Sequence, residues 1–332
     1  MYSLLAPAKV NLVLEVGGLR TDGYHEIATI FQSIALFDVV TVVPAAGAGA
    51  GAGEITGAPS QGIEVVVRKG EAPAGRDNLV WRAAALLAEK IGLEHPAVTI
   101  ILDKEVPAAA GLGGGSADAA AALRLLGQLW QVEDPAVLQE TAQAVGADVS
   151  FFLSGYGAAL GRGRGEKLLR LDLPVLWLVL ANPGRQCSTK EVYGLFEAAR
   201  QTKEHNGEQK GELAVVEAGK ESAGSSGELP APGRQCSRFL TALAEGGVAE
   251  AASFLYNDLA GPAGQISPEI NRLLAALKAG GALGAEVSGS GATVFALTGG
   301  SKEARRLAGE VAGIAAWTWW GPTLAQAHPN LG

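Results

Sequence analysis

The sequence is poor in cysteine, in long apolar stretches and in positive charge. Two cysteines, Cys187 and Cys236, are too few for a disulfide framework or a four-thiolate zinc site, which fits a reducing compartment. No apolar run approaches the ~20 residues that a membrane-spanning helix needs. Acidic residues outnumber basic ones by 34 to 26, a net charge of −8, so we expect neither nucleic acid nor a membrane surface as a partner.

The N-terminal residues also lack the marks of a targeting segment. They contain no basic region followed by an apolar block and a cleavage site, so we expect a mature, cytoplasmic protein. The 332 residues are 48% hydrophobic and 18% charged, which is typical of globular chains, and at about 150 residues per domain they predict two domains. The apolar run that begins at Leu171 divides these domains into 1–170 and 171–332. The sequence is compatible with a monomer or a homodimer.

Glycine is present in excess, at 46 of 332 residues against a usual share of ~7%. The Ala/Gly tract at 44–53 has the composition of a flexible loop. Residues 200–232 contain few apolar side chains to offset the entropy of ordering, so we predict a mobile insertion there. The hexapeptide Pro-Gly-Arg-Gln-Cys-Ser occurs at 183–188 and 232–237 with different sequences after each copy, which indicates a chance duplication and not a structural repeat.

Apolar periodicity predicts an α+β protein. Residues 8–16 alternate apolar and polar side chains, which is the period of a strand and puts Lys9 and Asn11 on the same face. Segments 30–43 and 63–68 lie on either side of the Ala/Gly tract and predict an antiparallel pair with a long tip. Further strands are expected at 98–102, at 171–180 and as a pair within 284–297. Helices are expected at 79–91, 117–130, 135–146, 149–153, 237–245, 249–256, 268–278 and 301–311.

The run Gly111-Leu-Gly-Gly-Gly-Ser116 lies between an expected strand and an expected helix. Glycines before a helix offer free backbone N–H groups, no Cβ to obstruct approach and the positive end of the helix dipole, and together these bind phosphate. The run is not a dinucleotide fingerprint, because Ser116 stands where that motif needs glycine, and it is not a Walker A loop, because no Gly-Lys-Ser/Thr follows. By itself, such a run in a glycine-rich chain is also compatible with a plain loop.

Three motifs together resemble the galactokinase, homoserine kinase, mevalonate kinase and phosphomevalonate kinase (GHMP) superfamily. They are Pro7-Ala-Lys-Val-Asn11-Leu, Pro107-Ala-Ala-Ala-Gly-Leu-Gly-Gly-Gly-Ser-Ala-Asp118 and Ser288-Gly-Ser-Gly-Ala-Thr-Val-Phe295. The resemblance covers nearly the whole chain except the Ala/Gly tract and residues 200–232. It lapses after Asn257-Asp258-Leu259, where Ala-Gly-Pro follows in place of an acidic residue. It implies an α+β, two-domain GHMP kinase fold, with an N-terminal domain like ribosomal protein S5 domain 2 and a ferredoxin-like C-terminal domain.

The resemblance implies phosphoryl transfer from ATP, with Mg²⁺ as the companion of the nucleotide. Ser116 is the candidate contact to the β-phosphate or to Mg²⁺, and the sequence shows no acidic ligand for the metal. The implied phosphate loop consists of Pro107, Ala108, Ala109, Ala110, Gly111, Leu112, Gly113, Gly114, Gly115, Ser116 and Ala117.

By its motif, Asp148 matches the base that accepts the proton of the alcohol, and Lys9 matches the catalytic lysine. The cation of Lys9 would orient the hydroxyl and offset charge on the phosphoryl group. From the residues alone, two plainer interpretations stay open. Asp148 could be the N-cap of the helix at 149–153, and Lys9 could be a solvated residue on the polar face of its strand.

Lys9-Val-Asn11-Leu, Asp22-Gly-Tyr24-His25 and Gly146-Ala-Asp148-Val resemble the branch of the superfamily that phosphorylates the 2-hydroxyl of a cytidine diphosphate-linked methylerythritol in non-mevalonate isoprenoid synthesis. In that branch the residue matching Tyr24 stacks on the cytosine, and the one matching His25 hydrogen-bonds its edge. The implied substrate residues are Asn11, Tyr24, His25, Tyr193, Ser288, Gly289, Ser290 and Gly291. Without the resemblance, Tyr24 and His25 would be exposed loop residues, Tyr193 a core residue and 288–291 an ordinary hairpin turn.

Two other functions remain open from the motifs. Another small-alcohol kinase of the superfamily, of homoserine or mevalonate type, would share the phosphate loop but would have no reason to keep Gly-Tyr-His. A catalytically silent relative that binds nucleotide and regulates a partner would have no reason to keep both Lys9 and Asp148.

Overall fold

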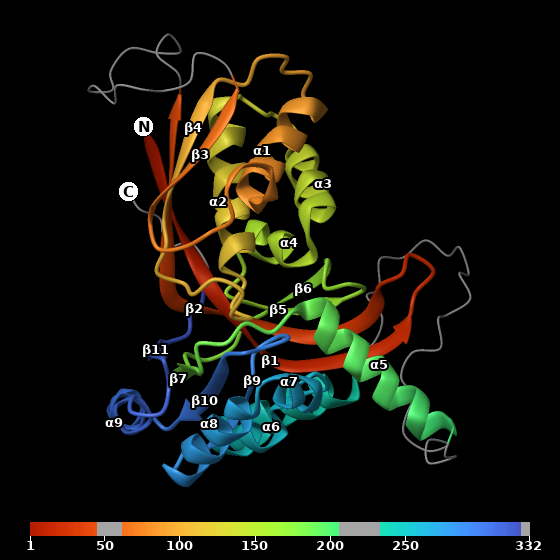
Figure 1. Ribbon diagram of the computed structural model, residues 1–332, viewed down its shortest axis with the longest axis vertical. Helices are drawn as coiled ribbons and strands as arrows, with labels where there is room; N and C mark the ends of the chain where they lie inside the picture. The colour runs from red at the N-terminus through yellow and green to blue at the C-terminus, as the bar shows by residue number, and fades with distance from the viewer. Residues whose placement is uncertain (45–61, 206–232, 327–332) are drawn as a thin grey trace.

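The computed structural model describes residues 1–44, 62–205 and 233–326. In this part of the chain the strands form two sheets, and helices cover them (Figure 1). The first sheet has the order β3-β4-β2-β1-β8, and β5 pairs with β2 and with β6. Its strands are β1 (Tyr2–Leu19), β2 (His25–Pro44), β3 (Ile63–Lys69), β4 (Val98–Asp103), β5 (Ala158–Arg162), β6 (Lys167–Leu171) and β8 (Tyr256–Asn257).

The second sheet has the order β11-β7-β10-β9, with all neighbours antiparallel. Its strands are β7 (Trp177–Asn182), β9 (Gly284–Val287), β10 (Val294–Thr298) and β11 (Trp317–Pro322). The helices beside the first sheet are α1 (Leu79–Lys90), α2 (Gly114–Leu129), α3 (Pro135–Val145) and α4 (Ala147–Ser154), preceded by the 3-10 turn η1 (Gly75–Asp77). Those that follow are α5 (Thr189–His205), α6 (Arg234–Ala251), the 3-10 turn η2 (Ala252–Phe254), α7 (Ala260–Ile266), α8 (Pro268–Ala279) and α9 (Ser301–Val311).

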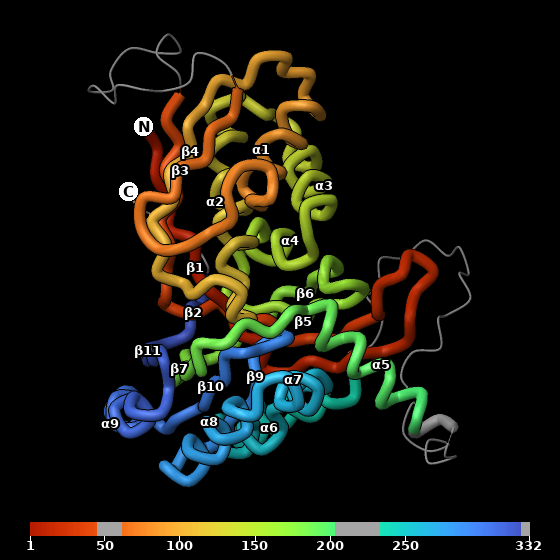
Figure 2. Tube along the Cα trace, viewed as in Figure 1, coloured from red at the N-terminus to blue at the C-terminus, as the bar shows by residue number. Residues whose placement is uncertain are grey.

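β1 and β2 connect the two halves of the molecule. They pair antiparallel from Tyr2 opposite Val42 to Leu19 opposite His25, and both run from the side of α1–α4 to the side of α6–α9 (Figure 2). Side chains of residues 6–16 in β1 are buried on both faces of the strand. The alternation predicted for β1 is therefore present, but its polar face is not solvated.

The antiparallel pair predicted between segments 30–43 and 63–68 is wrong. β4 lies between β2 and β3, antiparallel to the first and parallel to the second. β4 is buried along most of its length, whereas β3 alternates half-buried and exposed residues. The more apolar strand therefore occupies the inner position, although it comes about thirty residues later in the chain.

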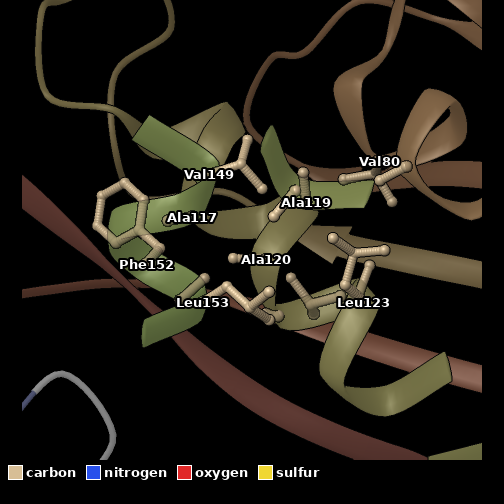
Figure 3. Packing of buried hydrophobic residues seen from close by; sticks show 14 of the residues in the cluster. Val80, Ala117, Ala119, Ala120, Leu123, Val149, Phe152 and Leu153 are labelled. Carbon is tan, nitrogen blue, oxygen red and sulfur yellow. The ribbon is translucent and has the colours of Figure 1, made fainter. Parts of the chain in front are cut away.

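α2 lies at the centre of the first core. Four successive alanines, residues 119–122, are fully buried, and these small side chains let α2 pack closely against its neighbours α1 and α4. Figure 3 shows this packing around Val80, Leu123, Val149 and Phe152. The packing fixes the N-terminal end of α2, which follows the glycine run.

Several local predictions need correction. Residues 200–205 of the predicted insertion form the last part of α5, and its remaining residues lie outside the described part of the chain, as do residues 45–53 of the Ala/Gly tract. The break predicted between helices 237–245 and 249–256 is present at Gly247 of α6, where φ is +74°, but the first helix begins earlier, at Arg234, and the second ends earlier, at Ala251. Tyr256 is in strand β8 and not in a helix. Among the described helices, none is both long and apolar enough to cross a bilayer.

The second half of the chain returns to the first sheet. β8 pairs in parallel with β1, and Thr323 forms a bridge with Ile34 in β2. The domain boundary that we propose at 170/171 falls at the last residues of β6, before the second sheet begins with β7. Segments of the second proposed domain therefore pair with β1 and β2 of the first.

Candidate active site

A cavity of about 370 Å³ opens where β1, the glycine run and the turn between β9 and β10 meet. It brings together residues that are far apart in the sequence and that come from both halves of the chain. Its lining comprises Lys9, Asn11, Leu14, Ile27, Phe31, Ala109, Gly111, Gly113, Asp148, Arg164, Cys187, Ser188, Thr189, Tyr193, Leu259, Gly289, Ser290 and Gly291.

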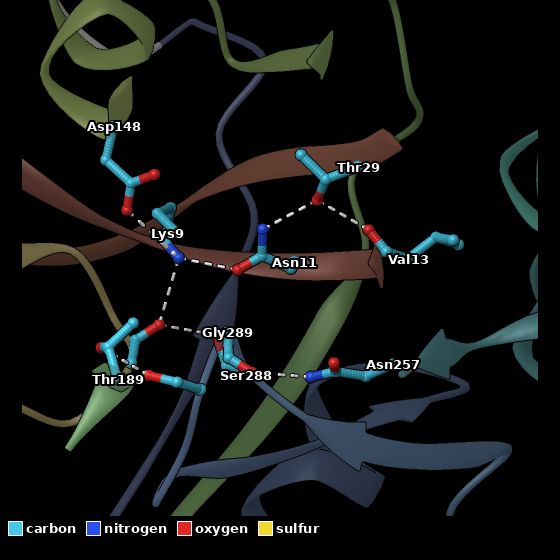
Figure 4. A network of polar contacts seen from close by, with 11 residues as sticks. Lys9, Asn11, Val13, Thr29, Asp148, Thr189, Asn257, Ser288 and Gly289 are labelled. Atoms are coloured by element: carbon cyan, nitrogen blue, oxygen red, sulfur yellow. Dashed lines mark hydrogen bonds and ion pairs between the residues drawn. The ribbon is translucent and has the colours of Figure 1, made fainter. Parts of the chain in front are cut away.

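Lys9 is held from three sides at the base of this cavity (Figure 4). Its Nζ donates hydrogen bonds to Asn11 Oδ1 at 2.7 Å and to the Gly111 carbonyl at 3.2 Å, and it lies 3.5 Å from Asp148 Oδ2. Lys9 is only 4% exposed, so the interpretation as a solvated surface residue is wrong. Two of the three donors of the ammonium are used in these hydrogen bonds, and the ion pair with Asp148 adds a third contact.

Asn11 is itself fixed in orientation. Its Nδ2 donates to Thr29 Oγ1 at 2.8 Å, and Thr29 Oγ1 donates to the Val13 carbonyl at 2.7 Å. This chain of bonds turns the amide oxygen of Asn11 toward Lys9. The predicted placement of Lys9 and Asn11 on one face of the strand is confirmed by their direct contact.

Asp148 lies in the first turn of α4. The N-cap of α4 is Gly146, so the interpretation of Asp148 as the helix cap is wrong. A carboxylate in the first turn is stabilised by the positive end of the helix dipole, and Lys9 provides a second positive charge. Its side chain is 33% exposed, and it lines the cavity. Asp148 therefore presents an acceptor to a bound molecule while Lys9 stays beneath it.

The glycine run forms a loop that ends earlier than predicted. α2 begins at Gly114 and not at residue 117, so Gly115 and Ser116 belong to its first turn. Gly111 and Gly113 have positive φ of +77° and +71°, a conformation that favours glycine. The Lys9 backbone N–H donates to the Leu112 carbonyl at 2.9 Å, which ties the loop to β1.

The turn at 288–291 packs directly against this loop. Ser288 Oγ donates to the Gly111 carbonyl at 2.9 Å, and a Cβ added at Gly111 would lie 2.2 Å from the Ser288 carbonyl oxygen. On the other side, Asn257 Nδ2 donates to the carbonyls of Val287 and Gly289, both at 2.8 Å. The turn connects β9 to β10, as the sequence predicts, and its glycines also allow the two halves of the chain to meet at the cavity.

The predicted aromatic residues separate into two groups. Tyr193 lines the cavity and stacks on His25, with ring centroids 5.3 Å apart. Burial, with the charges of Asp148 and Asp258, raises the pKa of Tyr193 to about 12, so its hydroxyl stays protonated. The His25 side chain is buried, with Nδ1 3.2 Å from the Gly17 carbonyl, whereas Tyr24 is 57% exposed. The exposed-loop interpretation therefore holds for Tyr24 and is wrong for His25.

Several known proteins are similar to this chain. The family described as GHMP kinases N terminal domain matches residues 78–156, and the one described as GHMP kinases C terminal matches residues 239–313. The 4-diphosphocytidyl-2-C-methyl-D-erythritol kinase of Pelotomaculum thermopropionicum is 39% identical over 310 residues, covering 93% of each chain. That of Nocardia farcinica is 38% identical over 317 residues, covering 93% of this chain and 88% of the relative.

This chain belongs to the 4-diphosphocytidyl-2-C-methyl-D-erythritol kinase family. A crystal structure of 4-(cytidine 5'-diphospho)-2C-methyl-D-erythritol kinase superposes with a TM-score of 0.70 at 34% identity, covering 97% of this chain and 98% of that one. A crystal structure of L. major mevalonate kinase in complex with R-mevalonate has a TM-score of 0.67 at 15% identity, covering 100% of this chain and 97% of that one, which shows a shared fold alone. The predicted GHMP kinase fold is confirmed, and the chain is an ATP-dependent kinase.

Several residues at the site were not predicted from the sequence. Thr189, at the start of α5, forms a hydroxyl contact of 2.9 Å with Ser290, and the guanidinium of Arg164 lies 4.9 Å from the Tyr24 ring centroid. Arg164 could have been found from the segment Gly163-Arg164-Gly165, because a cation between glycines is typical of a loop that binds an anion. Asn257 could have been found as well, because it belongs to the segment Asn257-Asp258-Leu259 compared with the superfamily above.

Throughout residues 1–44, 62–205 and 233–326, no group of three or more His, Cys, Asp and Glu side chains is placed to hold a metal ion. Ser116 lies half-buried in the first turn of α2, at the end of the glycine loop. Ser116 therefore brings one hydroxyl oxygen, and the start of α2 brings backbone N–H groups, which can bind phosphate oxygens but not a metal ion.

Proposed function

We propose that this chain transfers the γ-phosphoryl group of ATP to the 2-hydroxyl of 4-diphosphocytidyl-2-C-methyl-D-erythritol. The observation that carries the proposal is the Lys9–Asp148 pair at the base of a cavity bordered by the glycine loop. A tertiary alcohol is a poor nucleophile at neutral pH, so the reaction needs a positioned proton acceptor. The names of the relatives supply the identity of the alcohol.

Each residue of the pair has a distinct part in the proposed reaction. Asp148, one-third exposed, accepts the hydroxyl proton, an effect typically worth about 10²–10⁴-fold in rate. Lys9, buried and held by Asn11 and the Gly111 carbonyl, keeps its charge at one place and stabilises negative charge as the phosphoryl group moves. Little covalent chemistry is asked of the protein, because phosphoryl transfer depends mainly on positioning and electrostatics.

ATP binds in this proposal to the loop from Pro107 to Ala117. The free N–H groups at the start of α2 and the helix dipole hold its phosphates. Mg²⁺ usually keeps several waters and binds through substrate phosphates, so the sparse donor set at Ser116 fits a metal that arrives with the nucleotide. When bound, Mg²⁺ neutralises charge on the phosphates.

The cytidine end of the substrate is assigned to the other side of the cavity. Tyr193 provides a neutral aromatic wall, and His25 stacks behind it. Tyr24 is the exposed aromatic residue that can pack against a base, under the cation of Arg164. The glycines of the turn at 288–291 let the substrate approach the backbone closely.

The proposal places the enzyme in the cytoplasm, where a monomer or a homodimer would act on a small soluble substrate. It assigns no role to nucleic acid.

A substrate panel tests this function. The purified protein is incubated with ATP and Mg²⁺ and, in separate reactions, with the cytidylated methylerythritol, homoserine or mevalonate, and ADP release is measured. We expect ADP release to depend on the cytidylated alcohol and phosphate to appear on its 2-hydroxyl. Turnover with homoserine or mevalonate instead would favour the other small-alcohol kinases, and no turnover with any alcohol would favour a nucleotide-binding regulator.

A further inference from the structure

Three charged side chains are buried together beneath the glycine loop. Asp38 in β2 is fully buried, and Lys104 after β4 and Asp118 in α2 are 6% and 1% exposed. Lys104 Nζ donates to Oδ2 of both carboxylates. Lys104 precedes the loop in sequence and Asp118 follows it, so the cluster joins the two ends of the loop.

Asp38 makes further contacts to the loop itself. Its Oδ1 accepts hydrogen bonds from the backbone N–H groups of Glu105 at 2.6 Å and Val106 at 2.8 Å, the two residues before Pro107. On the far side of the loop, a Cβ added at Gly114 would lie 3.3 Å from Asp38 Oδ2. One carboxylate therefore bonds to the start of the loop and packs against the first residue of α2.

The stability of the fold does not by itself explain these charges. Removing ions from water is costly, and apolar side chains of similar volume usually stabilise a core as well or better. Apolar residues, however, would leave the N–H groups of Glu105 and Val106 without their acceptor and would not fix the direction in which the chain enters the loop. The arrangement of the bonds points to orientation of the loop.

We propose that Asp38 is a positioning residue for ATP binding: its carboxylate, oriented by Lys104, holds the start of the loop against the start of α2 so that the loop N–H groups face the phosphates of ATP. This inference rests on the proposed binding of ATP by the loop. Asp38 does not line the cavity, so it would act through the loop and not by contact with a substrate.

The test is the variant Asp38→Asn. Asp38 uses one carboxylate oxygen for Lys104 and the other for the backbone N–H groups of Glu105 and Val106. An asparagine has only one side-chain oxygen, so its NH2 group must face one of these two sets of donors and that contact is lost. We expect the KM for ATP to rise by about tenfold or more, the range typical of losing a hydrogen bond to a charged group. The KM for the alcohol should change little, and kcat at saturating ATP should fall less than the KM rises.

Glu15→Gln is the matched control. Glu15 is also a buried carboxylate that accepts bonds from two consecutive backbone N–H groups, those of Gln235 and Cys236 at 3.0 and 3.1 Å, but at the start of α6. Loss of stability alone should affect both variants alike. We expect Glu15→Gln to lower the melting temperature and to leave the KM for ATP unchanged.

If Asp38→Asn does not fold, the triple variant Asp38→Ala, Lys104→Met and Asp118→Leu replaces the whole charge cluster by apolar side chains and also removes the acceptor for the loop. An unchanged KM for ATP in a folded Asp38 variant, or an equal rise in the Glu15→Gln control, would overturn the inference. Absence of ATP-dependent turnover in the wild-type protein would instead overturn the proposed function on which it rests.

Discussion

At the scale of single residues, the side chains proposed for the site differ in how far they are exposed. Lys9 is buried among acceptors, whereas Asp148 and Tyr24 keep exposed surface. Local pattern was enough to predict that Lys9 and Asn11 share a face, because a strand repeats every two residues. It could not predict the contact between Thr189 and Ser290, which depends on how α5 and the β9–β10 turn meet in space.

The first prediction concerns recognition of the base. Tyr24→Ala removes a ring that is mostly exposed, so the free energy of unfolding should change little. Loss of one stacking face, at ~1 to 3 kcal/mol, should weaken binding of the cytidylated substrate roughly 5- to 150-fold. Steady-state kinetics with the cytidylated alcohol measures this, and the KM for ATP is the internal control.

His25→Ala is expected to act on specificity as well as on affinity. It removes the ring that stacks behind Tyr193, so the aromatic wall proposed for the base loses its support and the preference for cytidine over uridine substrates should narrow. The ratio of kcat/KM for the two substrates measures the preference. If this variant and Tyr24→Ala both discriminate as well as the parent, neither residue reads the base.

At the scale of elements, the site depends on close packing between the glycine loop and the β9–β10 turn. The sequence predicted both the loop before a helix and the turn between strands, since each is a local pattern of glycines. It could not predict that they touch, nor that β4 enters between β2 and β3, because strand order is decided by which strand buries more apolar surface.

Gly111→Ala tests this contact. The added Cβ would lie 2.2 Å from the Ser288 carbonyl, at a residue whose φ of +77° already disfavours alanine by about 1 kcal/mol or more. We expect a lower melting temperature and lower turnover, because the loop and turn must separate. Thermal unfolding and initial rates measure the two effects.

Gly309→Ala is the control for the same substitution. Gly309 lies exposed in α9, and nothing lies within 4 Å of an added Cβ. Alanine should there stabilise the helix by up to about 1 kcal/mol and leave turnover unchanged. Equal behaviour of the two variants would contradict a tight contact at Gly111.

At the scale of the whole molecule, the buried charges make stability depend on pH. Burial raises the pKa of Asp118 to about 7 from its ordinary value of 3.8, and the nearby charge of Lys104 opposes the shift. The folded state then holds a proton that the unfolded state releases, so stability should fall as pH rises from about 4 to about 7.

Asp118→Asn removes this contribution, since an amide does not titrate and Lys104 keeps its pairing with Asp38. Denaturant unfolding of both proteins at several pH values measures it. We expect the variant to gain stability relative to the wild type as pH rises through this window. A constant difference between them would show that Asp118 has an ordinary pKa in the folded protein.

Both halves of the chain line a single cavity, with Asp148 on α4, Lys9 on β1 and the turn between β9 and β10 from the second sheet. The most direct test of this account is single-turnover phosphoryl transfer by the wild type and by Asp148→Asn, with labelled ATP and the cytidylated alcohol. The amide keeps the size of the side chain but cannot take the proton, so the rate should fall by about 10² or more while ATP affinity changes little. Transfer at the wild-type rate by Asp148→Asn would contradict the account.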